Sequence, residues 1–137
     1  MSYDLMVFDP KAPPRDRKGF INWYKKQVSW SEEHDYSNPD VTTPKLLSWF
    51  LEMKGKYPHI SDTKIIINIF NPRLTEYSIG KSFIYACFKW SEMENARKMM
   101  FELAKKHSVG FFDVSAQEGQ VWIPDDNGEY RCIHGSR

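Results

Sequence analysis

The chain has 137 residues, the size of one domain, since domains usually run to about 100–150 residues. Its 19 Lys and Arg against 18 Asp and Glu give a net charge of +1. This balance argues against nucleic acid, because proteins that bind phosphate backbones usually carry a clear basic excess. With no apolar run near the roughly 18 residues of a membrane helix and only two cysteines, Cys87 and Cys132, the sequence predicts no membrane span, disulfide framework or metal site. The opening residues MSYDLMVF show no signal peptide, so we expect a cytoplasmic protein with reduced thiols.

The first half of the chain predicts one strand and two helices. Residues 2–8 alternate between two sets of side chains, as a strand does. A helix is expected from about Arg15 to Trp30, where apolar residues recur on one stripe. After the polar segment SWSEEHDYSNPDVTTP, Thr43 supplies a capping hydroxyl and Pro44 a proline at the first helical position. A second helix is therefore expected from there to about Lys56.

The second half predicts two hairpins with a helix between them. Residues 60–74 are either irregular or an extra strand, because KIIINIF has strand propensity but NPRL interrupts it. In TEYSIGKSFIYACFKW, the pair Gly80-Lys81 is expected to form a type II′ turn between two strands. Ser91 and Glu94 have the spacing of a capping box, which predicts a helix to about His107. VGFFDVS and QVWIP predict a closing hairpin.

The expected order is strand, two helices, two strands, helix, two strands. It is a βαββαβ framework with one inserted helix and one added C-terminal strand. Right-handed crossovers give such a framework a mostly antiparallel sheet with helices on one face. We therefore predict an α+β protein with a ferredoxin-like two-layer sandwich. Residues 1–124 form this single domain, and residues 125–137 form a polar C-terminal tail with little to anchor it.

The stretch KSFIYACF has the rhythm of the third strand of RNA-recognition domains, a basic residue followed by aromatics at alternate positions. In such domains, bases stack on strand aromatics, here Phe83 and Tyr85, with Lys81 at a phosphate. Ser82 and Ile84 stand where small residues would let nucleic acid approach, and the first strand is a poor match to the partner motif. Any two-layer fold also needs such a strand for its core. An RNA-binding domain of this type is the alternative function, and nucleic acid is the less favoured partner.

The sequence predicts no catalytic residues, and hence no enzyme and no cofactor. Pro39-Asp40 with Glu52-Met53-Lys54 imitates a nuclease signature, but Glu52 and Lys54 would point about 200° apart on a helix. Cys87 lies in an apolar strand, where thiols are usually buried and inert. Asp113 is the best candidate for a perturbed carboxylate, although a strand-end Asp more often caps a turn. Nothing in the sequence combines a nucleophile, a base and a residue that orients the base.

The loop WSEEHDYSNPD places aromatic residues beside acidic ones. Such a mixture suits capture of a basic protein surface, because the charges steer the encounter and the rings supply buried area. The competing interpretation is a solvated loop in which Trp30 folds back onto the core. The predicted partner-binding residues are Trp30, Glu32, Glu33, Asp35 and Tyr36.

Blocks spread over residues 2–124 resemble a family of small, mostly uncharacterised bacterial cytoplasmic proteins. They include SYDLMVFDP, FINWY, YSIGKSFIYACFKWS and KHSVGFFDVS, with Ser108 where glycine is common. The resemblance implies a protein of the kind encoded beside polymorphic or contact-dependent toxins, where such proteins act as immunity partners. It brings no catalytic residues with it. We therefore expect a non-catalytic immunity or antitoxin protein that masks the active surface of a cognate toxin, whose contacting surface is expected to be basic.

Overall fold

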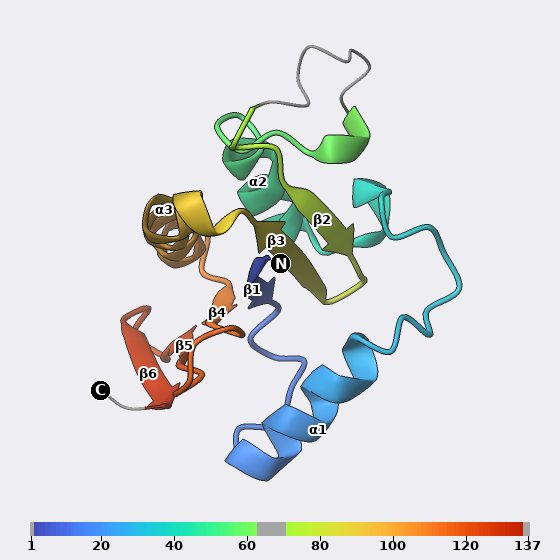
Figure 1. The fold of residues 1–137 in the computed structure, drawn as a ribbon. Coiled ribbons are helices and arrows are strands. Elements are labelled where there is room, and N and C mark those ends of the chain that lie inside the picture. The colour runs from blue at the N-terminus through green and yellow to red at the C-terminus, as the bar shows by residue number, and fades with distance from the viewer. Residues whose placement is uncertain (1, 63–70, 136–137) are drawn as a thin grey trace.

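The computed structural model describes residues 2–62 and 71–135. It has one six-stranded sheet at its centre and three α-helices packed around it (Figure 1). The strands are β1 (Tyr3–Phe8), β2 (Glu76–Ile79), β3 (Phe83–Phe88), β4 (Gly110–Phe112), β5 (Val121–Pro124) and β6 (Tyr130–His134). The helices are α1 (Arg17–Gln27), α2 (Pro44–Met53) and α3 (Met93–Lys106).

The strands lie in the order β2-β3-β1-β4-β5-β6, and every neighbouring pair is antiparallel. The longest strands, β1 and β3, pair over their full length, from Tyr3 opposite Phe88 to Phe8 opposite Phe83. The predicted mixed α/β class with a mostly antiparallel sheet is therefore confirmed, and the sheet has one strand more than predicted. Within the described residues, no helix combines the length and the apolar character needed to cross a membrane.

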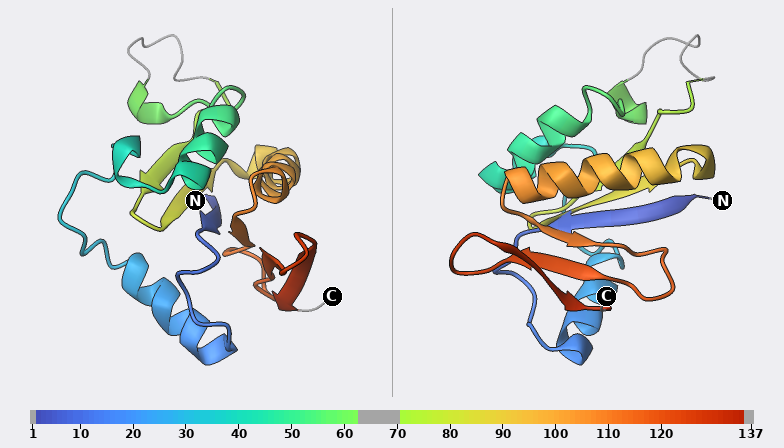
Figure 2. Two further views of the ribbon diagram at one scale, coloured as in Figure 1. Left: turned by 180° about the vertical axis from the view of Figure 1, so that it is seen from behind. Right: turned by 90° about the vertical axis from the view of Figure 1, so that its left-hand side faces the viewer.

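Helices cover both faces of the sheet, so the expected placement of all helices on one face is wrong for α1. Figure 2 shows α2 and α3 on one side and α1 on the other. The reason lies in β1, where Leu5 and Val7 point to α2 and α3 while Met6 and Phe8 point to α1. All four side chains are fully buried. A strand that is apolar on both faces needs a covering layer on each side.

The N-terminal ends of the helices follow local capping chemistry in two cases out of three. Asp16 caps α1 by accepting a hydrogen bond from the Gly19 N–H at 2.8 Å. Thr43 caps α2 as predicted, with Pro44 as the first helical residue. The predicted capping box of α3 is wrong, because Ser91 lies inside a 3₁₀ turn and the capping residue, Glu92, makes no side-chain cap bond.

The β2–β3 hairpin forms as predicted, but its turn is not of type II′. The Gly80 N–H donates to the Phe83 carbonyl at 2.8 Å, and Gly80 is not among the glycines with positive φ. Glycine is needed there for space, since a Cβ atom on residue 80 would overlap the Phe83 ring. The β4–β5 hairpin also forms as predicted.

The end of the chain is not the loosely anchored tail expected for residues 125–137, because Tyr130–His134 form strand β6 on the edge of the sheet. Asp125 sets up the turn by accepting hydrogen bonds from the N–H groups of Asn127 and Glu129, each at 2.9 Å. The Tyr130 hydroxyl then donates to the Val109 carbonyl at 2.5 Å and fixes the strand to the body of the protein.

The prediction for residues 60–74 is only partly tested. Residues Ile60–Asp62 form a short 3₁₀ turn, and residues 63–70, which hold all of KIIINIF, lie outside the described residues.

Candidate functional site: an aromatic and acidic surface beside α1

Trp30 is the most unusual residue of the predicted partner-binding loop. Its backbone is left-handed, with a φ of 57°, and its side chain is 44% exposed. A left-handed backbone costs about 1–2 kcal/mol for a residue other than glycine, and such outliers in bulky residues concentrate at functional sites. Helix α1 ends at Gln27, three residues earlier than predicted, so Trp30 lies just beyond it, where a glycine often reverses the chain.

The Trp30 ring joins a cluster of aromatic rings on the α1 side of the sheet. Its centroid lies 5.2 Å from Tyr36, 5.9 Å from Tyr85 and 6.2 Å from Phe83, and the first two contacts are edge-to-face. Such contacts are worth about 0.5–1.5 kcal/mol each and hold the ring in a defined position. Trp30 therefore packs on the protein on one side, as the competing interpretation expects, and is open to solvent on the other.

The acidic residues of the loop divide into one structural group and two exposed ones. The side chain of Glu32 is only 18% exposed; its carboxylate accepts from the Lys81 N–H at 3.0 Å and lies 2.5 Å from His34 Nε2. The hydrogen bond between the Glu32 carboxylate and the His34 ring raises the pKa of His34. Glu32 thus ties the loop to the β2–β3 turn, whereas Glu33 and Asp35 are exposed and free to meet a partner.

Tyr36 and Asp35 fix the shape of the loop. The Tyr36 hydroxyl accepts from the Glu32 N–H at 2.8 Å, and the Tyr36 carbonyl accepts from the Ile79 N–H at 2.7 Å. The Asp35 carboxylate accepts two bonds from Ser37, which lower the pKa of Asp35 and keep it ionised. The loop is therefore fastened along the β2 edge of the sheet by several hydrogen bonds.

The sheet continues this surface with residues that the sequence did not single out. The register places Glu76, Cys87 and Asp4 in one row across β2, β3 and β1, on the side that faces α1. Tyr85 lies in the next row, and its hydroxyl donates to the Asp4 carboxylate at 2.6 Å. Burial raises the pKa of Tyr85, with this bond as the next cause. Asp4 and Tyr85 are half-buried and Glu76 is exposed, so α1 leaves this part of the sheet open.

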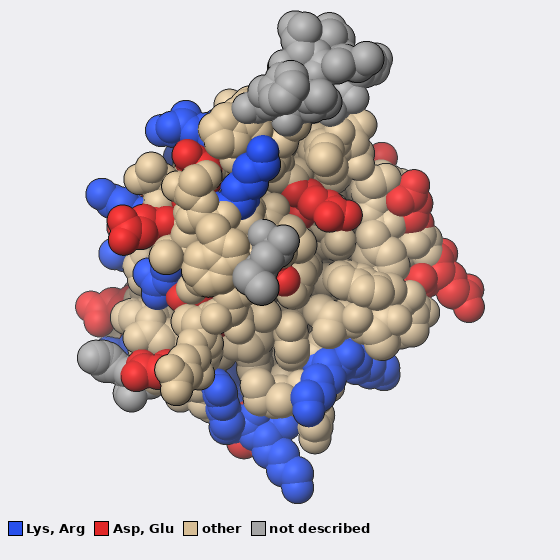
Figure 3. Space-filling view, viewed as in Figure 1, with Lys and Arg blue, Asp and Glu red and all other residues tan. Residues whose placement is uncertain are grey.

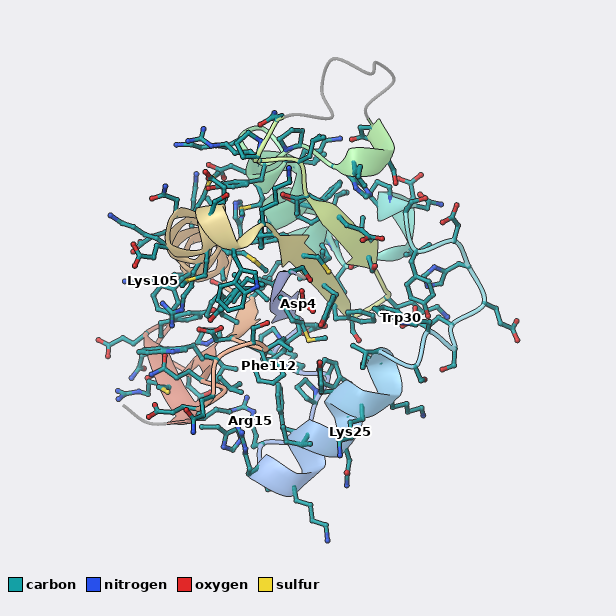
Figure 4. All side chains as sticks on the ribbon, viewed as in Figure 1. Asp4, Arg15, Lys25, Trp30, Lys105 and Phe112 are labelled. Atoms are coloured by element: carbon teal, nitrogen blue, oxygen red, sulfur yellow. The ribbon has the colours of Figure 1, made fainter. Side chains whose placement is uncertain are left out.

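We call this region the aromatic–acidic surface. It consists of Trp30, Tyr36 and Tyr85 with the carboxylates of Asp4, Glu33, Asp35 and Glu76. Figure 4 shows Trp30 and Asp4 on the same side of the molecule, with Lys25 of α1 below them. In Figure 3, acidic side chains gather along the right-hand edge, where residues 31–40 run, and uncharged surface separates them from the basic side chains of α1.

The loop residues of this surface were found from composition, and the sheet residues were not. Asp4, Met6 and Phe8 stand at every second position of the sequence. The pattern therefore predicted that Asp4 lies on the same side of the strand as Met6 and Phe8. What the pattern did not show was that α1 would cover only part of that side.

The candidate catalytic residues are held in structural roles. Asp113 is 3% exposed and accepts hydrogen bonds from the Tyr3 hydroxyl at 2.7 Å and from Arg97 Nε at 2.6 Å. Burial, with Asp4 as the next cause, raises the pKa of Cys87 to about 12, so its thiol stays protonated. Glu52 pairs with Lys106, and Lys54 pairs with Asp62. These two residues of the nuclease-like pattern therefore interact with different side chains.

The described residues hold no group of three or more His, Cys, Asp or Glu side chains placed to bind a metal ion. Both cysteines are free thiols.

The alternative RNA-stacking pair does not offer two open rings. Phe83 is 0% exposed, under Trp30 and Tyr36, and only Tyr85 reaches the surface. A base stacks on an open aromatic face, so Phe83 is unable to serve without displacement of Trp30. Comparison of the chain with protein-family models, curated proteins and solved structures finds no match.

Proposed function

We propose that this chain is a non-catalytic protein-binding protein, an immunity or antitoxin protein that neutralises a cognate bacterial toxin by masking its active surface. The observation that carries the proposal is Trp30, a large ring held half-exposed on a strained backbone and braced by Tyr36 and Tyr85. Tryptophan and tyrosine dominate binding energy at protein interfaces because they bury large area with little loss of conformational entropy.

The charge around Trp30 supports a basic partner. Glu33, Asp35 and Glu76 are exposed carboxylates beside the rings, and Asp4 lies at the edge of the same surface. Carboxylates at the rim of an interface speed the encounter with a basic surface and disfavour acidic partners. A rigid loop keeps the entropic penalty of binding small, which favours the tight association an inhibitor needs. We propose that this neutralisation takes place in the cytoplasm.

The topology supports a finer proposal about the fold. Strands β2-β3-β1-β4 with α2 and α3 have the strand order and single-sided helices of a ferredoxin-like unit. We propose that α1 and the β5–β6 segment are additions to that unit. Helix α1 and the loop after it create the aromatic–acidic surface on the face that the unit itself leaves open.

The experiment is neutralisation of the toxin domain encoded beside this chain. The C-terminal domain of a neighbouring large secreted protein is expressed in bacteria with this chain, and growth and affinity are measured. The variant Trp30→Gly, Glu33→Lys, Asp35→Lys is expected to weaken binding by about 30-fold or more, because hot-spot residues contribute about 2 kcal/mol or more each. Glu94→Lys with Glu102→Lys, on the outer side of α3, is the control for added positive charge. Equal protection by both variants would contradict the proposal.

A further inference from the structure

A cavity of about 510 Å³ lies between the end of α2, the first half of α3 and the segment that leads into β2. It opens on the α2–α3 side of the sheet, away from α1 and the aromatic–acidic surface. We call it the basic pocket. Its lining includes Lys56, Tyr57, Arg73, Asn95, Lys98 and Glu102.

Positive charge prevails in this lining, although the whole chain is almost neutral. Lys56, Arg73 and Lys98 come from three separate elements, and the lining contains one carboxylate, Glu102. Neighbouring lysines on α2 and α3 have partners, since Lys54 pairs with Asp62 and Lys106 with Glu52. Within residues 2–62 and 71–135, the ammonium groups of Lys56 and Lys98 have no ion-pair partner within 4.0 Å. Arg73 is paired with Glu92, and Glu102 lies in the lining, so the excess of positive charge that a bound anion would offset comes from the two unpaired lysines.

Arg73 is held so that part of its guanidinium stays available. Its Nε donates to Glu92 at 3.4 Å, and the guanidinium lies over the Tyr57 ring at 5.8 Å. Glu92 is itself fixed by the Tyr57 hydroxyl at 2.8 Å, and the Arg73 N–H is bonded to the Asn71 side chain at 2.9 Å. The terminal nitrogens of Arg73 have no hydrogen-bond partner in the described part of the chain. An arginine fork held in this way matches two oxygens of a phosphate group.

We propose that the basic pocket binds a phosphate-bearing anion, with Arg73 as the fork, Lys56 and Lys98 as point charges and the Asn95 amide as a further donor. The chemistry that these groups share is donation to oxyanion oxygens, and Glu102 is the one carboxylate of the lining that opposes it. The pocket uses none of the residues of the aromatic–acidic surface. Its occupation and the capture of a toxin are therefore independent of each other.

The test is calorimetric titration of the whole protein with pyrophosphate and, separately, with ATP, at constant ionic strength. Saturable binding of one anion per chain is expected. Lys56→Gln with Lys98→Gln should weaken it about tenfold or more, because hydrogen bonds to charged groups contribute about 1.5–3 kcal/mol. Lys25→Gln with Lys26→Gln on α1 removes the same charge far from the pocket and should change affinity less than about twofold, because exposed, distant charges are screened by salt.

The two anions distinguish the sources of the phosphate. Tighter binding of ATP would assign the site to an organic phosphate ester, and equal binding would assign it to a free oxyanion. Thermal unfolding of each variant without ligand checks that the fold is intact. The proposal is overturned by an absence of saturable binding up to about 10 mM, where even a millimolar site would be mostly filled. It is equally overturned if both lysine pairs weaken binding to the same extent.

Discussion

The two faces of the sheet are formed by the same strands, but they differ in how much of each face is buried. On the α2–α3 side, Leu5, Val7, Ile84 and Ala86 are all fully buried beneath two helices. On the α1 side, burial is complete around Phe8 and Phe83, but in the row that contains Asp4 and Glu76 the first is half-buried and the second exposed. The closed face supplies stability, and the partly open face leaves aromatic rings and carboxylates available to another molecule.

Truncation of one tryptophan on each face is the clearest test of this difference between the faces. Trp49 of α2 is fully buried, and its indole N–H donates to the Met100 carbonyl at 3.3 Å. Trp49→Ala is expected to lower the free energy of unfolding by about 3–5 kcal/mol, since it leaves a cavity and removes the hydrogen bond to Met100. Trp30→Gly should change it by less than about 1 kcal/mol, because relief of the left-handed strain offsets the lost ring contacts. Urea denaturation measures both, and similar losses would show that the two faces do not differ.

A smaller effect is expected from the ion pair between Arg97 and the buried Asp113, which lies on the α2–α3 side of the sheet. Arg97→Ala removes the cation that faces the buried Asp113 carboxylate and leaves it with the Tyr3 hydroxyl alone. We expect the free energy of unfolding to fall by about 2–4 kcal/mol. This is at or below the range for breaking a fully buried ion pair, because Arg97 is itself one-third exposed. The control is Glu94→Ala, on the exposed side of the same helix, and chemical denaturation compares the two variants. A loss no greater than the control's would remove Asp113 from the set of stabilising groups.

The smallest effect concerns pH and the closed face. His59 is buried and makes edge-to-face contacts with the rings of Phe50 and Tyr77, and among residues 2–62 and 71–135 its Nε2 has no hydrogen-bond partner. Burial lowers the pKa of His59 below its ordinary value of about 6.5. The unfolded chain therefore binds a proton at a higher pH than the folded chain, so this residue destabilises the fold as pH falls below about 6.5.

Thermal unfolding at pH 7.5 and 5.5 tests this sign. His59→Phe should lose less stability than the parent between these two values, because phenylalanine fills a similar space without taking up a proton. His34, whose pKa is raised, titrates in the opposite sense in both proteins and cancels in the comparison. An equal pH dependence in parent and variant would mean that His59 is not the group that responds.

Local signals in the sequence predicted most of the elements. Thr43-Pro44 marked the start of α2 correctly, and alternating residues marked β1, β3 and the hairpin of β4 and β5. Some errors came where distant contacts decide. Strand β6 has only five residues and weak alternation, and it forms because β5 offers it an edge and Tyr130 reaches Val109. The turn at Gly80 is a local error, since glycine is needed there for the Phe83 ring three residues on and not for a positive φ.

The candidate site shows the same division. Its loop was recognisable from the mixture of Trp30, Glu33, Asp35 and Tyr36, because composition alone identifies residue types suited to an interface. The role of Glu32 was not recognisable, since it depends on a backbone N–H from Lys81, 49 residues away.

The sequence by itself determined the three α-helices, strands β1 to β5 and the amphipathic faces, because caps, turns and periodicity act between neighbours in the chain. Only the tertiary structure decided which face of the sheet α1 covers and where that cover ends. That outcome depends on how the rings of Phe8, Phe20 and Phe112 pack together. Packing of this kind joins residues about 90 positions apart, so the extent of the cover over the row of Asp4 and Glu76 is a property of the tertiary structure.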